Sequence, residues 1–107
     1  MSEYASIYRN HCASISSKSL WQIDTAITIT MKIDTSSCSF NRTPFYFVSI
    51  AGNNNHYCLA GYGAIYQATN ESFQIYTSTM CGGWSAATMV SMAVSNGWDI
   101  NWIGFYK

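Results

Sequence analysis

The stretch AITITMKI, residues 26–33, decides the fold class of this chain. Apolar and polar side chains alternate along it, which is the period-two pattern of a strand that buries one face. The buried face would carry Ile27, Ile29, Met31 and Ile33. FQIYT, at residues 73–77, alternates in the same way after a turn at residues 68–72. We therefore predict a strand at each stretch.

The rest of the chain consists of short apolar segments separated by Gly, Asn and Ser turns. LWQI, at residues 20–23, would be a lead-in or a short partner of the first strand. Residues 56–66 are predicted to form one long strand, interrupted at Ala60-Gly61, where a bulge fits. Further strands are predicted at residues 45–50 and 98–106.

One short helix is expected near residues 85–96, with Ser85 as its N-cap and Gly97 just after its end. Strands joined by turns, with at most one short helix, predict an all-β fold: a small antiparallel β-sandwich of about six strands. We expect a single domain over residues 1–107, with residues 1–19 as an N-terminal lead-in.

Two of these strands carry apolar residues on both faces. In the last one, Trp98, Ile100 and Trp102 would share one face, while Asp99, Asn101, Ile103 and Phe105 share the other. FYFVSI, at residues 45–50, is similar, yet an antiparallel sheet usually leaves one face wet. The second face needs a cover, either from the same chain or from an identical subunit, and we favour a homo-oligomer.

The composition excludes several classes of protein. The chain has 107 residues, zero formal net charge and only 9% charged residues, with 16% aromatic ones. Disordered chains are rich in charged residues and poor in aromatic ones, and proteins that bind nucleic acid neutralise its phosphates with many Lys and Arg residues. This chain fits neither class. The N-terminus lacks the pattern of a signal peptide, and no apolar run is long enough to span a membrane. We expect a soluble protein, cytoplasmic or released by an unconventional route, whose surface suits neutral polyhydroxy ligands.

The four cysteines, Cys12, Cys38, Cys58 and Cys81, allow three pairings, and without a signal peptide free buried thiols are the default. For the same reason no glycosylation is expected at the sequons NRT (residues 41–43) and NES (residues 70–72). His56 and Cys58 would share a strand face, but no other ligand stands at a spacing typical of zinc. Residues 53–55 have too few nearby carboxylates for a strong calcium site. No metal and no cofactor are expected.

Enzymatic activity is also not expected. The five acidic residues lie on separate segments, so nothing indicates the paired carboxylates of a glycosidase. Cys81 lies in a glycine loop, and although His11 or His56 could act as its base, the helix start typical of a cysteine nucleophile is missing.

The loops, in contrast, have the chemistry of a sugar site, which needs an aromatic platform beside amide, carboxylate or imidazole groups. Trp84, Tyr57 or Tyr62 would stack on the sugar. The hydrogen-bonding residues would be Asn54, Asn55, His56 and Asp99.

Three segments resemble H-type lectins: RTPFYFVSI (residues 42–50), IYQATNESF (residues 65–73) and DINWIGF (residues 99–105). The resemblance implies a six-stranded sandwich that assembles as a trimer or larger and binds galactose-type sugars, notably N-acetylgalactosamine, in grooves between protomers. At positions where the family tends to place an Arg and a Trp-His pair, this chain has Ala64 and Thr79-Met80. No sugar-contacting residue is therefore transferred from the family.

The sequence hypothesis is a non-enzymatic lectin that gains avidity as a homo-oligomer, with glycans as partners and no nucleic acid or membrane insertion. The alternative is a structural or adhesive module that only assembles with itself.

Overall fold

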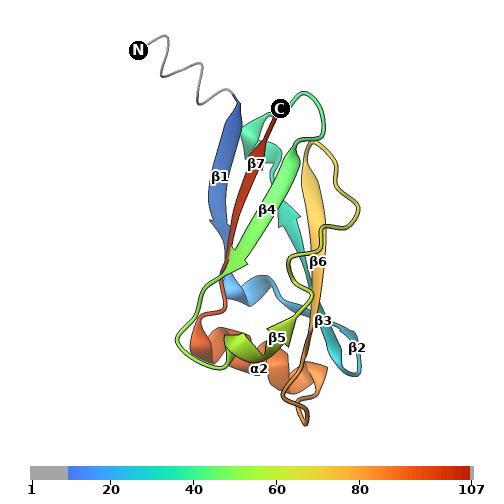
Figure 1. Ribbon diagram of the computed structural model, residues 1–107, viewed down its shortest axis with the longest axis vertical. Coiled ribbons are helices and arrows are strands. Elements are labelled where there is room, and N and C mark those ends of the chain that lie inside the picture. Colours follow the sequence, from blue (N-terminus) through green and yellow to red (C-terminus); the bar gives the residue numbers. More distant parts are fainter. Residues whose placement is uncertain (1–9, 107) are drawn as a thin grey trace.

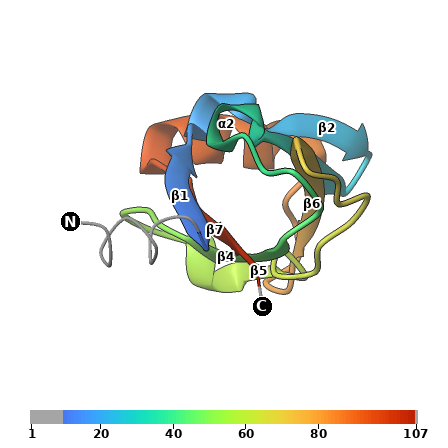
Figure 2. The ribbon, with the colours of Figure 1, turned by 90° about the horizontal axis from the view of Figure 1, so that it is seen from above.

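Two antiparallel sheets enclose one core in the computed structural model, which describes residues 10–106 (Figures 1 and 2). The three-stranded sheet has the order β1 (His11–Ser16), β7 (Ile100–Phe105), β4 (Phe45–Ile50). The four-stranded sheet has the order β2 (Gln22–Thr25), β3 (Thr28–Asp34), β6 (Ser72–Thr79), β5 (Leu59–Ala60). The predicted all-β sandwich is confirmed.

The core lies between the sheets and follows the predicted alternation. Ile29, Met31 and Ile33 of β3 are fully buried, and they pair across the ladder with buried residues of β6. From the other sheet, Trp98, Ile100 and Trp102 are at most 5% exposed, as the pattern of the last strand predicted. Ile27 is an exception at 65% exposed, because residues 26–27 form the turn between β2 and β3.

The predicted helix is confirmed as α2 (Ala86–Asn96), which packs against β2 and β3. Ser85 accepts a hydrogen bond from the Thr88 N–H, and Gly97 ends the helix in the left-handed region at φ 69°. None of the helices in residues 10–106 is long and apolar enough to cross a membrane.

The prediction of one long strand over residues 56–66 is wrong. Asn55 has a left-handed backbone (φ 69°) and turns the chain into the short 3₁₀ helix η3 (His56–Cys58). Only β5 follows as strand, and Gly61, at φ 86°, starts a loop that meets β6 again at a single bridge between Tyr66 and Gln74.

The N-terminal lead-in contains a strand that was not predicted, because residues 11–16 form β1 at the edge of the three-stranded sheet. A short 3₁₀ helix, η1 (Lys18–Leu20), connects β1 to β2 through Trp21. Residues 1–9 of the predicted lead-in lie outside the described residues.

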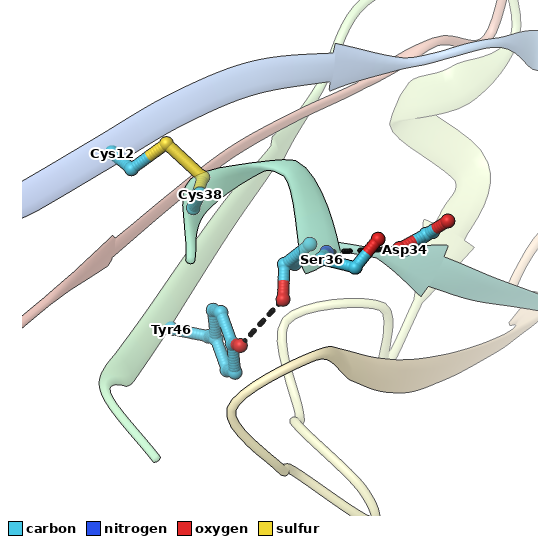
Figure 3. The surroundings of a disulfide bond; sticks show 6 residues. Cys12, Asp34, Ser36, Cys38 and Tyr46 are labelled. Atoms are coloured by element: carbon cyan, nitrogen blue, oxygen red, sulfur yellow. Dashed lines mark hydrogen bonds between the residues drawn. A yellow bond between two sulfur atoms is a disulfide. The ribbon is translucent and has the colours of Figure 1, made fainter. Parts of the chain in front are cut away.

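The expectation of free thiols is wrong, because all four cysteines are paired. Cys12 of β1 is bonded to Cys38, the last residue of the 3₁₀ helix η2 (Ser36–Cys38), as Figure 3 shows. Cys58 of η3 is bonded to Cys81, in the loop between β6 and α2. Each bond joins two segments near the end of a strand ladder or just beyond it. Hydrophobic alternation along the sequence does not indicate such a pairing.

Candidate functional site

The predicted sugar loop lies at the end of the sandwich beside α2 and is firmly anchored. The Asn53 N–H donates to the Asn96 carbonyl (2.8 Å), and the Trp98 indole Nε1–H donates to the Asn54 carbonyl (2.9 Å). A side chain at Gly52 would collide with Trp98. The loop can therefore lie against the buried indole only because residue 52 is glycine. Asn54 is exposed and Tyr57 is 76% exposed, so both are presented to solvent from a fixed backbone.

The other predicted residues lie outside this loop. Asp99 is near the loop, since its carbonyl accepts from the Ala51 N–H (2.9 Å), but its carboxylate Oδ1 already accepts from the Lys18 N–H (2.7 Å). Trp84 and Tyr62 are half-buried and pack against the core. Trp84 precedes α2, whereas Asn53 contacts the far end of that helix at Asn96. The Cys58–Cys81 disulfide joins the other end of the loop to the segment that leads into Trp84.

Of the seven predicted residues, the structure therefore groups the four of the loop, with Asp99 close by. In the part of the chain that the structure describes, no ring contact joins Tyr57, Tyr62 and Trp84. Within that part, His56 Nδ1 is buried without a hydrogen-bond partner.

A second candidate site, not predicted from the sequence, lies on the outer face of β3 and β6. Two adjoining hollows of about 490 and 200 Å³ share Lys32 and Ser72, and both are open to solvent. We call them together the polar hollow. Its hydrogen-bonding residues are Lys32, Asp34, Ser36, Gln67, Thr69, Glu71, Ser72 and Gln74.

The strand ladder fixes the centre of the polar hollow. Lys32 is paired with Gln74, and Asp34 with Ser72. Residues that are directly opposite each other in an antiparallel ladder point to the same side. Since Ile33 and Phe73 point into the core, these four polar side chains point outward together.

The turn at residues 69–72, which forms one wall of the polar hollow, is held by hydrogen bonds from Thr35, just before η2, and from Tyr46 of β4. The Thr35 N–H donates to the Glu71 carbonyl (2.8 Å), and the Tyr46 hydroxyl donates to the Thr69 carbonyl (2.7 Å). Within the turn, Thr69 Oγ1 accepts from the Glu71 and Ser72 N–H groups, each at 3.1 Å. The site is thus built on rigid elements, as a recognition site requires.

The polar hollow contains one cationic and two anionic side chains: Lys32, Asp34 and Glu71. Hydrogen bonds from Ser36 lower the pKa of the Asp34 carboxyl below its usual value, and the Lys32 charge acts in the same direction. Figure 3 shows the bond from the Ser36 N–H to Asp34 Oδ1 (2.9 Å). Asp34 is therefore an ionised acceptor at neutral pH, fixed in position by its own turn.

An aromatic pair stands beside the polar hollow on the same side of the sheet. Tyr66 bridges Gln74 and is 48% exposed, and its ring meets that of Tyr76 edge-on at 5.1 Å. Tyr76 follows Gln74 by two residues in β6, so both side chains point outward. Aromatic rings, amides and carboxylates thus lie together on one face.

Sequence reasoning missed the polar hollow because its residues occupy the polar positions of alternating strands, which are normally just solvated. One signal was present in the sequence: β3 ends at a charged residue, Asp34, and β6 begins at a hydroxyl residue, Ser72, and the two are paired.

No family model matches the chain, and neither a curated protein nor a solved structure matches it. The resemblance to H-type lectins therefore stays a prediction.

Proposed function

We propose that this chain is a non-enzymatic carbohydrate-binding module, and that its sugar site is the polar hollow on β3 and β6. The observation that carries the proposal is that two polar groups of this hollow are held in place before any ligand binds: the Asp34 carboxylate accepts from the Ser36 N–H (2.9 Å), and the Gln74 amide donates to Thr30 Oγ1 (3.0 Å).

The chemistry of the polar hollow suits a neutral polyhydroxy ligand. An ionised carboxylate accepts hydrogen bonds from two neighbouring hydroxyls, while Lys32 and the Gln amides donate to sugar oxygens. Tyr66 offers a ring for the apolar face of the sugar. The resemblance to H-type lectins makes galactose-type sugars the first ligands to test. Open sites of this kind bind weakly, so an oligomer would raise the avidity.

The experiment is a glycan array probed with the wild-type protein and three variants, with and without chelator. Asp34→Asn removes the charge but retains an oxygen for the Ser36 N–H, and loss of a charged hydrogen bond should weaken binding about tenfold. Asp24→Asn is the matched control, since Asp24 is an exposed carboxylate on β2, outside the polar hollow. Tyr57→Ala tests the predicted loop.

Selective binding that Asp34→Asn weakens and Asp24→Asn leaves intact would support the polar hollow. Binding that only Tyr57→Ala abolishes would return the site to the loop of residues 54–57. An array that stays blank at high protein concentration would contradict the carbohydrate proposal.

A second candidate function is a self-assembling structural or adhesive module with no small ligand. It is favoured by one observation, the large apolar side chains that stay exposed on the three-stranded sheet: Ile15 (64%), Phe45 (53%) and Phe47 (55%). The glycan array separates it from the first candidate, because such a module would ignore every sugar.

A further inference from the structure

The outer face of the three-stranded sheet combines exposed apolar area with a lack of charge. The registers of β1 with β7 and of β4 with β7 place nine side chains on this face in three rows. The rows are His11, Phe105, Phe45; then Ala13, Ile103, Phe47; then Ile15, Asn101, Ser49. None of them is Lys, Arg, Asp or Glu. We call these nine residues the apolar face; its strands lie side by side in Figure 1.

The apolar face has a ridge between two hollows. The rings of Phe47 and Phe105 stack at 5.4 Å with an interplanar angle of 11°, and Phe45 adds to them at 6.1 Å from Phe105. On one side of this aromatic ridge, a hollow of about 310 Å³ is lined by Phe47, Ser49, Asn101 and Ile103, among others. On the other side, a hollow of about 290 Å³ lies along Phe105 toward β1.

We propose that the apolar face is the interface with a second copy of this chain, related by a two-fold axis. An uncharged face offers no recognition to a charged partner, whereas a second copy meets it without repulsion and without leaving a charge unpaired. The same patch on both subunits is the defining property of a two-fold interface.

The shape of the apolar face fits the same arrangement. With a two-fold axis between the aromatic ridge and one of the hollows, the ridge of one copy lies over that hollow of the other. A cavity of roughly 150 Å³ accommodates a benzene ring, so a hollow of about 310 Å³ has room for a phenylalanine ring. Asn101, whose Nδ2 donates to Ser49 Oγ (3.3 Å), keeps its carbonyl oxygen available as an acceptor at the polar end of the face.

The small size of the apolar face predicts a dimer of low affinity. Three strands about 4.8 Å apart and six residues long at about 3.3 Å each give a face of roughly 20 by 15 Å. This is smaller than the roughly 800 Å² that each partner buries in an interface of standard size, which places the dimer in the weak class. We expect a dissociation constant in the micromolar range.

The dimer also determines where its ligand sites point, and this step rests on the proposed function. The polar hollow is on the outer face of the other sheet, so both outer faces point away from the shared core (Figure 2). Pairing through the apolar face leaves two polar hollows facing outward in different directions. Such a dimer bridges two glycan-bearing surfaces, and avidity then comes from many dimers that join the same two surfaces.

The test is sedimentation velocity over a concentration series of the full chain, from about 1 to 500 µM, a range chosen for a weak interface. Wild type should shift from monomer to dimer. Phe47→Lys should stay monomeric, because it puts a charge in the middle row of the apolar face, next to the central residue Ile103. Val94→Lys, on the exposed side of α2, is the matched control: it also adds one Lys at a half-exposed apolar residue, and it should dimerise like wild type.

A monomer at every concentration, or a dimer that Phe47→Lys does not weaken while its circular dichroism stays native, would overturn the proposal. A trimer dissolved by Phe47→Lys would overturn the two-fold arrangement. A variant without residues 1–9 that dimerises where the full chain does not would assign the face to that segment instead of a second copy.

Cross-linking of glycan-coated beads tests the last step separately. Phe47→Lys should bind the beads without cross-linking them, while Asp34→Asn should still sediment as a dimer but bind weakly. A blank glycan array with an intact dimer would overturn the proposed function alone, and a sugar-binding monomer would overturn the interface alone.

Discussion

The Tyr46 hydroxyl joins three segments that are far apart in the sequence. Its single proton goes to the Thr69 carbonyl, so the hydroxyl of Thr35, 2.7 Å away and fully buried, must donate to the Tyr46 oxygen. The Tyr46 ring can take this position because Gly104, its partner across the ladder, has no side chain: a Cβ there would approach the rings of Phe40 and Tyr46 to 2.9 Å. Tyr46 thereby holds the turn that forms one wall of the polar hollow.

Replacing this hydroxyl should destabilise the fold. Tyr46→Phe leaves the Thr35 hydroxyl and the Thr69 carbonyl without their partner, and we expect the free energy of unfolding to fall by about 1–3 kcal/mol. Urea unfolding measures the change. Tyr106→Phe is the control, because it breaks hydrogen bonds to Asn41 at an exposed site and should cost less than about 1 kcal/mol. Equal losses in both variants would contradict the role given to Tyr46.

The same residue predicts how stability depends on alkaline pH. Burial raises the pKa of Tyr46 above its usual 10.0, although the Thr35 hydroxyl opposes the shift. The folded state thus favours the neutral phenol, so its contribution to stability is complete below pH 10 and is lost as the pH rises through the pKa of the folded state. The loss is at most about 1.4 kcal/mol per pH unit. Urea unfolding from pH 8 to 11 should show this decline in wild type and a weaker one in Tyr46→Phe; identical slopes would refute it.

At the scale of elements, the sequence predicted those whose burial alternates clearly. β3, β6 and β7 alternate, and α2 has both of its caps, so local pattern and tertiary packing agree for these elements. β1 was missed because its one buried residue, Ser16, is small and polar, and a disulfide rather than apolar burial holds the strand. η3 was missed because it depends on a left-handed Asn55, and asparagine only permits that conformation without requiring it.

The cap of α2 predicts a measurable effect on stability. Ser85→Ala removes the oxygen that accepts from the Thr88 N–H at 3.1 Å, and it should lower the free energy of unfolding by about 1 kcal/mol. Ser91→Ala is the matched control, since Ser91 is exposed in the helix interior, where alanine is the better helix former. Thermal and urea unfolding would contradict the assignment if Ser85→Ala were as stable as Ser91→Ala.

The candidate site was less predictable than the elements. The chemistry of the Asn53–Tyr57 segment is visible in the sequence, but its position relative to Trp84 depends on α2 and on the Cys58–Cys81 disulfide. The polar hollow depends on the register of β3 with β6 and on hydrogen bonds between turns, such as the one from the Thr35 N–H to the Glu71 carbonyl. The pattern of residues along one strand gives neither the register between two strands nor the hydrogen bonds between turns.

At the scale of the whole molecule, the two disulfides close loops at opposite ends of the three-stranded sheet. Cys12 lies near the row of His11 and Phe105, while Cys58 follows the loop beyond Ile50, at the other end of β4. Such bonds are typical of proteins that fold in an oxidising environment. We therefore expect this chain to need one to reach full stability.

Reduction should weaken the fold strongly. The bonds span 26 and 23 residues, and loop-closure entropy then assigns about 3–4 kcal/mol to each. Urea unfolding with and without reductant measures the loss, and mass mapping should find the pairs Cys12–Cys38 and Cys58–Cys81. Thiol labelling of the unreduced, denatured protein that detects free cysteine would contradict the pairing.

The position of the first disulfide also decides how the domain responds to mechanical force. The chain enters and leaves the fold side by side, since the Tyr106 N–H donates to the Asn10 carbonyl (2.8 Å) and His11 pairs with Phe105. Tension applied to both ends would therefore peel β1 from β7 one residue pair at a time, which is the weakest direction for a sheet. Cys12 is the second residue of β1, so its covalent bond to Cys38 would stop the separation of β1 from β7 after the first residue pairs. The force would then act on the segment that contains Cys38.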